Sequence, residues 1–117
     1  MPRRSEFVNY VLEQLAPLGD VTARGMFGGW GIYLDGRMFA LVAFETLFIK
    51  ADDESRAEFE RAGLQPFTYQ RGKKEVAVMS FYQPPADALE DRELLCVWAR
   101  KGVDAARRSG TKRRRRK

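Results

Sequence analysis

The sequence predicts an α+β fold, in which helices pack in two layers against an antiparallel sheet of five to six strands. Near both ends of the chain, apolar residues recur at three- and four-residue spacing, which is typical of amphipathic helices. Between residues 21 and 50, and again between 66 and 83, the apolar residues alternate with smaller or polar ones, as in strands. The expected order is therefore α-β-β-β(-β)-α-β-β-α.

The first expected helix covers residues 5 to 16. Ser5 is a suitable N-cap, and Pro17 with Gly19 ends the helical pattern. One apolar stripe runs along this segment, formed by Phe7, Val8, Val11, Leu12 and Leu15.

Three turn signals divide residues 21 to 50 into strands: Gly28-Gly29, Asp35-Gly36 and Glu45-Thr46. Asp-Gly between alternating apolar runs is a strong hairpin signal, because a type I′ turn needs positive φ at both positions. Alternation groups the side chains by face: Trp30, Ile32 and Leu34 on one side of their strand with Gly31 and Tyr33 on the other; Phe39, Leu41 and Ala43 on one side of the next, with Ala40, Val42 and Phe44 on the other. Both faces are apolar, so we expect helices or a partner against more than one side.

The second half of the chain predicts a helix, a hairpin and a helix. Residues 51 to 63 are expected to be helical, with Asp52 or Asp53 as the N-cap and Gly63 just after the end. Residues 66–70 and 76–83 form a hairpin around the polar turn 71–75. The last helix starts near Asp87 or Asp91.

Residue types argue against an enzyme. The chain has no histidine, which removes the usual base near neutral pH and the commonest metal ligand. Cys96, the single cysteine, lies among apolar residues and is expected to be a buried thiol. The carboxylates concentrate at helix starts and turns, where capping and hydration explain them. We expect no catalytic residue, cofactor or metal; carboxylate-only hydrolysis and a carboxylate magnesium or calcium site remain the alternatives.

The glycine-rich stretch 24–42 raises the question of phosphate binding. It matches neither G-x-x-x-x-G-K-[ST] nor G-x-G-x-x-G, and a strand follows its glycines where an anion site needs a helix N-terminus. We interpret the glycines as permitting a bulged turn and the close approach of another backbone or ring. A small-ligand cradle is the alternative.

The same stretch resembles the TfoX N-terminal domain family, the amino-terminal half of the TfoX/Sxy regulators of bacterial competence. The likeness covers roughly residues 5 to 106. Its signature positions are Arg24, Met26, Phe27, Gly28, Gly29, Gly31, Tyr33, Asp35, Gly36 and Lys50. The resemblance implies an α+β fold and a non-enzymatic regulatory or adaptor role through protein contacts, since full-length members act with the cAMP receptor protein. It implies a single-domain member, because the second, helical domain of those regulators has no room here.

The net charge of +5 is concentrated at one end. Residues 107 to 117 hold eight of the 21 basic residues and no acid, leaving 13 basic against 16 acidic residues over 1 to 106. We therefore expect a domain over residues 1–106 and a disordered basic tail over 107–117. The alternative function is non-specific nucleic-acid binding by the tail residues Arg107, Arg108, Lys112, Arg113, Arg114, Arg115, Arg116 and Lys117. Two other roles of this tail stay open: it only increases solubility, or it contacts anionic lipid.

The remaining features leave several interpretations. Arg24, Lys50 and Lys74 either form a small anion or partner site or pair with Asp35, Asp52 or Glu75; with Arg71, Lys73 and the tail they would extend a nucleic-acid path. The aromatic residues are core, or a stacking platform for single strands, and part of the apolar surface serves a homodimer or a protein partner such as transcription machinery. No small-molecule substrate is predicted. Without a signal-like or membrane-spanning apolar run, the expected location is the cytoplasm.

Overall fold

The computed structural model describes residues 6–26 and 28–115, with side chains up to residue 109. It confirms the predicted order and the α+β class. The helices, with two short 3-10 helices (η), and the strands are α1 (Glu6–Gln14), η1 (Ala16–Leu18), β1 (Thr22–Met26), β2 (Gly29–Leu34), β3 (Arg37–Ala43), β4 (Thr46–Lys50), α2 (Arg56–Arg61), β5 (Pro66–Arg71), β6 (Lys74–Tyr82), η2 (Ala86–Glu90) and α3 (Arg92–Arg115).

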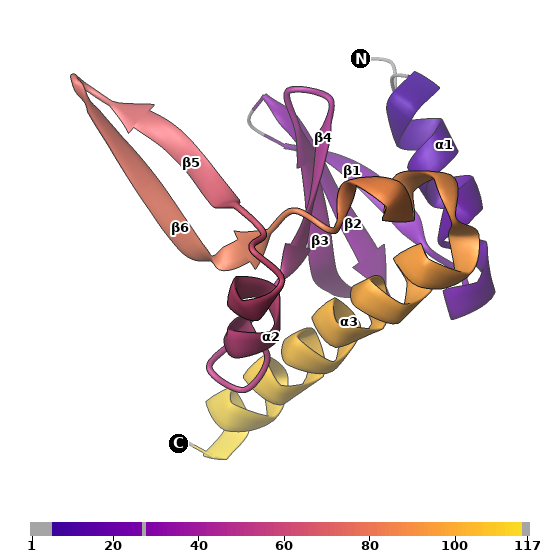
Figure 1. The fold of residues 1–117 in the computed structure, drawn as a ribbon. Helices are drawn as coiled ribbons and strands as arrows, with labels where there is room; N and C mark the ends of the chain where they lie inside the picture. The colour runs from indigo at the N-terminus through magenta and orange to yellow at the C-terminus, as the bar shows by residue number, and fades with distance from the viewer. Residues whose placement is uncertain (1–5, 27, 116–117) are drawn as a thin grey trace.

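All six strands form one antiparallel sheet in the order β1-β2-β3-β4-β6-β5. The long helix α3 packs across β3 and β4, and α1 lies beside it on the same side of the sheet (Figure 1). The β5–β6 hairpin extends away from the rest of the sheet, because β6 pairs with β4 at only two positions, Ile49 with Tyr82 and Lys50 with Phe81 (Figure 1). No helix among the described residues is long and apolar enough to span a membrane.

The hairpin turns differ in detail from the sequence prediction. The Asp35-Gly36 turn is confirmed, with φ of 54° and 78°, as a type I′ turn requires. Gly29 is already the first residue of β2 and pairs with Met26, so it belongs to the strand rather than to the predicted turn. The β3–β4 turn is formed by Phe44 and Glu45, both at φ 55°, rather than by residues 45 and 46.

A β-bulge in β3 corrects the predicted division of side chains between the two faces. Ile32 pairs with Ala40, but the next residue of β2, Tyr33, pairs with Met38. Phe39 is therefore the extra residue, and alternation is interrupted there. As a result Phe39 joins Ala40 on the helix-covered face instead of sharing the other face with Leu41.

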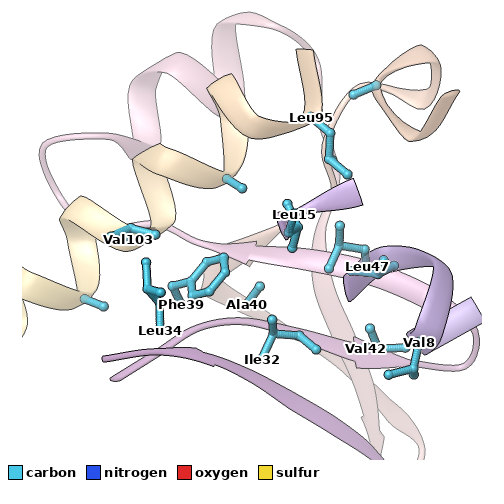
Figure 2. Close-up of a cluster of buried hydrophobic side chains, with 14 residues drawn as sticks. Val8, Leu15, Ile32, Leu34, Phe39, Ala40, Val42, Leu47, Leu95 and Val103 are labelled. Atoms are coloured by element: carbon cyan, nitrogen blue, oxygen red, sulfur yellow. The ribbon is translucent and has the colours of Figure 1, made fainter. Parts of the chain in front are cut away.

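The core lies between the sheet and the helices α1 and α3 (Figure 2). Its fully buried side chains include Leu15 from the loop after α1, Leu95 from α3 and Phe39 from β3. Contact between α3 and the sheet is very close at Gly102, where a Cβ would lie 2.6 Å from the carbonyl oxygen of Phe39 and 2.7 Å from a methyl group of Ile49. The glycine thus lets a helix backbone lie almost directly on two strands.

The helix ends agree in part with the predicted caps. Gly63 follows α2 at φ 73°, and the Asp91 carboxylate accepts a hydrogen bond from the Leu94 N–H at the start of α3. In contrast α2 begins at Arg56, later than predicted. The Asp52 carboxylate instead accepts the Ser55 N–H and closes the turn that precedes the helix.

The last helix runs into the segment that was expected to be a basic tail, residues 107–117. Helix α3 continues to Arg115, and residues 116 and 117 lie outside the described part. Ala105 and Ala106 of this helix are buried, and beyond them the Arg108 side chain binds Asp52. Arg107 and Arg108 therefore belong to the folded domain, and arginine and lysine favour continuation of a helix.

Candidate functional site

One face of the sheet is packed by strand residues alone; we call it the open face. Its buried residues are Ala43, Phe48 and Phe81. Partly buried residues surround them, all from strands: Met38, Leu41, Phe67 and Val78. The Phe67 ring from β5 reaches over to the Phe48 ring of β4, with centroids 5.0 Å apart, although β6 lies between the two strands. The sheet thus curls around this cluster, and no helix of the described chain covers it.

Two signature cations border the open face and contact its aromatic rings. The Arg24 guanidinium lies 4.8 Å from the ring centre of Tyr33, and the Lys50 ammonium lies 5.4 Å from that of Phe81. Such cation–π contacts hold a charge beside an apolar surface. Arg24 on β1 and Lys50 on β4 are separated by two strands, so they do not form one compact anion site.

The carboxylates considered as partners for these cations are engaged elsewhere. Asp52 binds Arg108, and Asp35 lies 4.0 Å from Arg107. Neither Arg24 nor Lys50 makes an ion pair within the described residues.

The β5–β6 hairpin continues the open face with the same character. Its register places Phe67 opposite Val78 and Tyr69 opposite Val76, and opposite pairs share a face. At the tip of the hairpin, Arg71 and Lys74 form the next opposite pair on the same face. The carboxylate of the hairpin, Glu75, points to the other face, where it accepts a hydrogen bond from Thr68.

A hollow of 680 Å³ lies at one end of the sheet, between the β1–β2 and β3–β4 turns. Several signature residues line it. Its described lining is Gly25, Met26, Gly28, Gly29, Trp30, Val42, Phe44 and Glu45. A Cβ on Gly29 would collide with the Val42 carbonyl oxygen, so this glycine permits close approach of two strands. None of the described lining residues belongs to a helix, and signature residue Phe27 lies outside the described part.

Phe44 is an unusual residue at the edge of this hollow. It is 82% exposed and adopts φ 55°, a left-handed conformation that side chains other than those of glycine, asparagine and aspartate seldom take. A large apolar side chain is thus held in solvent on a strained backbone, which neither packing nor turn preference explains.

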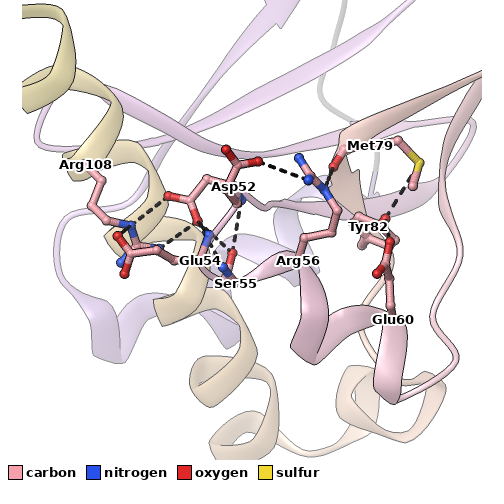
Figure 3. Close-up of polar contacts among 9 residues, drawn as sticks. Asp52, Glu54, Ser55, Arg56, Glu60, Met79, Tyr82 and Arg108 are labelled. Carbon is pink, nitrogen blue, oxygen red and sulfur yellow. Dashed lines mark hydrogen bonds and ion pairs between the residues drawn. The ribbon is translucent and has the colours of Figure 1, made fainter.

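A polar cluster around Asp52 joins α3 to the segment before α2 (Figure 3). Arg108 donates from Nε and from one terminal nitrogen to the two Asp52 carboxylate oxygens, at 2.7 and 2.9 Å, and Glu54 lies 3.3 Å from the same Nε. The Arg108 hydrogen bonds hold the pKa of Asp52 far below its ordinary value of 3.8, and Asp52 in turn raises the pKa of Arg108. This bidentate contact has the geometry of a structural clamp.

Two observations concern metal binding and nucleophilic chemistry. No group of three histidine, cysteine, aspartate or glutamate side chains within them is arranged to hold a metal ion. Cys96 donates to the Gln14 carbonyl oxygen at 3.4 Å, and burial raises the pKa of its thiol. A thiol in this state is a poor nucleophile.

The sequence identified the cations and the aromatic residues but not their arrangement. The distribution of acidic residues could have indicated this arrangement. All 16 acidic residues lie within the described part, and only Glu75 lies in a strand, so the strand cations share their strands with a single acidic residue. The Asp52–Arg108 contact joins residues 56 positions apart, and no local pattern indicates it.

These features define a small α+β domain whose sheet is covered by helices on one face and left open by the described residues on the other. The chain belongs to the TfoX N-terminal domain family, whose model matches residues 13–106. It is 32% identical over 76 residues to the DNA transformation protein TfoX1 of Aliivibrio fischeri (strain ATCC 700601 / ES114). That match covers 65% of this chain and 34% of TfoX1, so the chain spans about a third of the length of this relative.

Proposed function

We propose that the chain is a non-enzymatic regulatory or adaptor domain of the competence type, which acts in the cytoplasm through contacts with another protein. The observation that carries the proposal is the open face, where the described chain leaves a contiguous apolar surface without helical cover. Apolar surface of this kind commonly marks a protein-interaction site. Family membership and the similarity to a DNA transformation protein support the regulatory context.

The test uses the native host with the gene deleted and restored. Deletion is expected to lower the transcripts of DNA-uptake genes, and the wild-type chain restores them. Leu41→Asp, in the middle of the open face, should fail to restore them because it places a charge in the contact. The matched control is Val97→Asp, which changes a side chain that is 56% exposed on α3 and should restore them fully.

Fold integrity of each variant is checked by circular dichroism. Met26→Asp is a second open-face variant, because Met26 is 43% exposed and its sulfur, like that of Met38, lies against the open-face side of Gly31. Unchanged uptake-gene transcripts after deletion would contradict the regulatory function. Full restoration by both open-face variants would contradict its location on this surface.

Direct, largely non-specific nucleic-acid binding is the second candidate function, supported by the basic residues after position 107. The truncation that separates the two functions must keep Arg108, because its removal would also break the Asp52 contact. A full-length variant is therefore better, with glutamine at the six last basic residues, Lys112, Arg113, Arg114, Arg115, Arg116 and Lys117.

Titration with DNA and RNA at several salt concentrations distinguishes the candidates. If this segment binds phosphates, wild type binds weakly with a log K versus log salt slope of about −5 for six contacts, and the glutamine variant loses the binding. Equal binding by both proteins would refute this role for the segment.

A further inference from the structure

We infer that the open face binds an acidic protein segment with apolar anchor residues. This inference rests on the proposed function and names the chemistry of its partner. The open face combines an apolar centre with cations at three places: Arg24 beside Tyr33, Lys50 beside Phe81, and the Arg71–Lys74 pair at the hairpin tip. A partner that matches it has carboxylates around apolar side chains.

The distribution of charge over the domain directs an acidic partner to this face. Residues 1–108 carry 15 basic and 16 acidic residues, so this part of the chain has almost no net charge, and its attraction for an acidic chain depends on where the charges lie. The acids are segregated into helices, turns and loops; the one acid in a strand, Glu75, lies on the other face of the hairpin. The strands contribute five cations, of which Arg24, Lys50, Arg71 and Lys74 border the open face.

The side chains of the open face favour a polypeptide over nucleic acid. Single-strand binding by stacking needs aromatic rings with free faces. Here Phe48 and Phe81 are only 6% and 8% exposed, and the Arg24 guanidinium lies over the Tyr33 ring. The Phe67 ring packs against Phe48 and Tyr69 stacks on Phe67, so these two rings are also engaged within the face. The other side chains, such as Met38 and Leu41, are flexible or aliphatic and accept varied apolar anchors.

A second copy of this chain is also a poor occupant. In a two-fold symmetric dimer through this face, the same patch would face itself, so the cations Arg24 and Lys50 of one copy would approach those of the other. Like charges brought together in an interface oppose association.

Selection from random peptides on the full chain tests the inference without assuming a sequence. Peptides of about 15 residues displayed on phage are panned against wild type, and the enriched sequences are synthesised and titrated by fluorescence anisotropy. We expect them to be net negative and to contain large apolar residues. Lys50→Glu and the more exposed Arg24→Glu should each weaken binding about 10-fold, because each turns an attraction into a repulsion. Arg100→Glu makes the same charge change on α3, on the other side of the sheet, and should leave affinity within about twofold.

Other outcomes overturn the inference. In the selection, these outcomes are no enrichment, or enrichment of neutral or basic peptides. In the titrations, the contradicting outcome is that Lys50→Glu and Arg24→Glu bind the peptides as tightly as wild type. Tighter binding of an oligothymidylate, or self-association seen by sedimentation, would also contradict the inference if Lys50→Glu abolishes it. The host assay separates such a failure from failure of the proposed function. If Leu41→Asp loses the uptake-gene transcripts while Lys50→Glu and Arg24→Glu keep them, regulation through this face stands and the acidic partner does not.

Discussion

Both faces of the sheet are apolar, yet they are completed in different ways. On the covered face, α1 and α3 bury Ile32, Phe39 and Leu47 almost completely. On the open face, Phe48 and Phe81 are buried only by other strand residues, and cations lie at the border. The difference teaches that a strand with apolar side chains on both faces needs a packing partner on each face. The described chain supplies helices for one face only. The core and the proposed recognition surface thus lie on opposite sides of one sheet.

Phe39→Ala is expected to have the largest effect, and its comparison with Leu41→Ala tests that separation directly. Two positions apart in β3, the two residues lie on opposite faces. Truncating fully buried Phe39 should lower the free energy of unfolding by ~3–5 kcal/mol, since it leaves a cavity under α3. Truncating half-buried Leu41 to alanine should lower the free energy of unfolding by only about 1 kcal/mol. Urea unfolding measures both, and equal losses would show that the open face is also core.

Gly102→Ala should come next, with a loss of ~1–3 kcal/mol in the free energy of unfolding. Alanine is the better helix former by about 1 kcal/mol, so an isolated helix would gain from the change. Its Cβ, however, would meet the Phe39 carbonyl oxygen and Ile49, and α3 must move off the covered face. Thermal unfolding is the measurement, with exposed Val97→Ala in the same helix as the control. A stabilised Gly102→Ala protein would refute the close contact.

Asp52→Asn should lower the free energy of unfolding by ~1–2 kcal/mol at pH 7, because the carboxylate of Asp52 accepts two bonds from Arg108 and Asn cannot replace the charge. The pKa of Asp52 is lowered in the folded protein, so this contribution is present above its ordinary pKa of 3.8 and is lost as the pH falls below it.

Denaturant unfolding of both proteins between pH 7 and pH 2.5 measures this effect. The difference between wild type and Asp52→Asn should stay constant down to about pH 5 and shrink below pH 4. A difference that grows toward acid pH would contradict the clamp. Asp53→Asn, at a neighbouring exposed carboxylate, is the matched control and should change stability by under about 0.5 kcal/mol.

Phe44→Asn should have the smallest effect, and of the opposite sign. Asparagine adopts positive φ more easily than phenylalanine, so the turn loses strain and the protein gains about 0.5–1 kcal/mol. Asp35→Asn, in the Asp35-Gly36 turn, is the control, because aspartate already tolerates positive φ. Loss of stability in Phe44→Asn, seen as a lower Tm, would mean that the Phe44 side chain packs in solution.

Much of the fold could be predicted because its signals are local. Asp35-Gly36 specifies its own turn, Gly63 ends α2 by adopting positive φ, and the change of apolar period separates helices from strands. The bulge at Phe39 was missed because one extra residue in β3 leaves the apolar pattern unbroken while it reverses the faces. The open face could be predicted only in part. The sequence indicated its apolar residues, but not that the helices α1 and α3 would lie on the same side of the sheet.

The sequence by itself determined the α+β order, the Asp35-Gly36 hairpin, the family signature and the absence of histidine chemistry. Only the tertiary structure decided which apolar face is covered, where the cations lie and how far the domain extends along α3. The physical reason is the separation along the sequence between the residues that interact. Turns, caps and periodicity depend on residues a few positions apart, whereas the Asp52–Arg108 clamp, the Gly102 contact and the cationic border of the open face join segments that meet only when the chain folds.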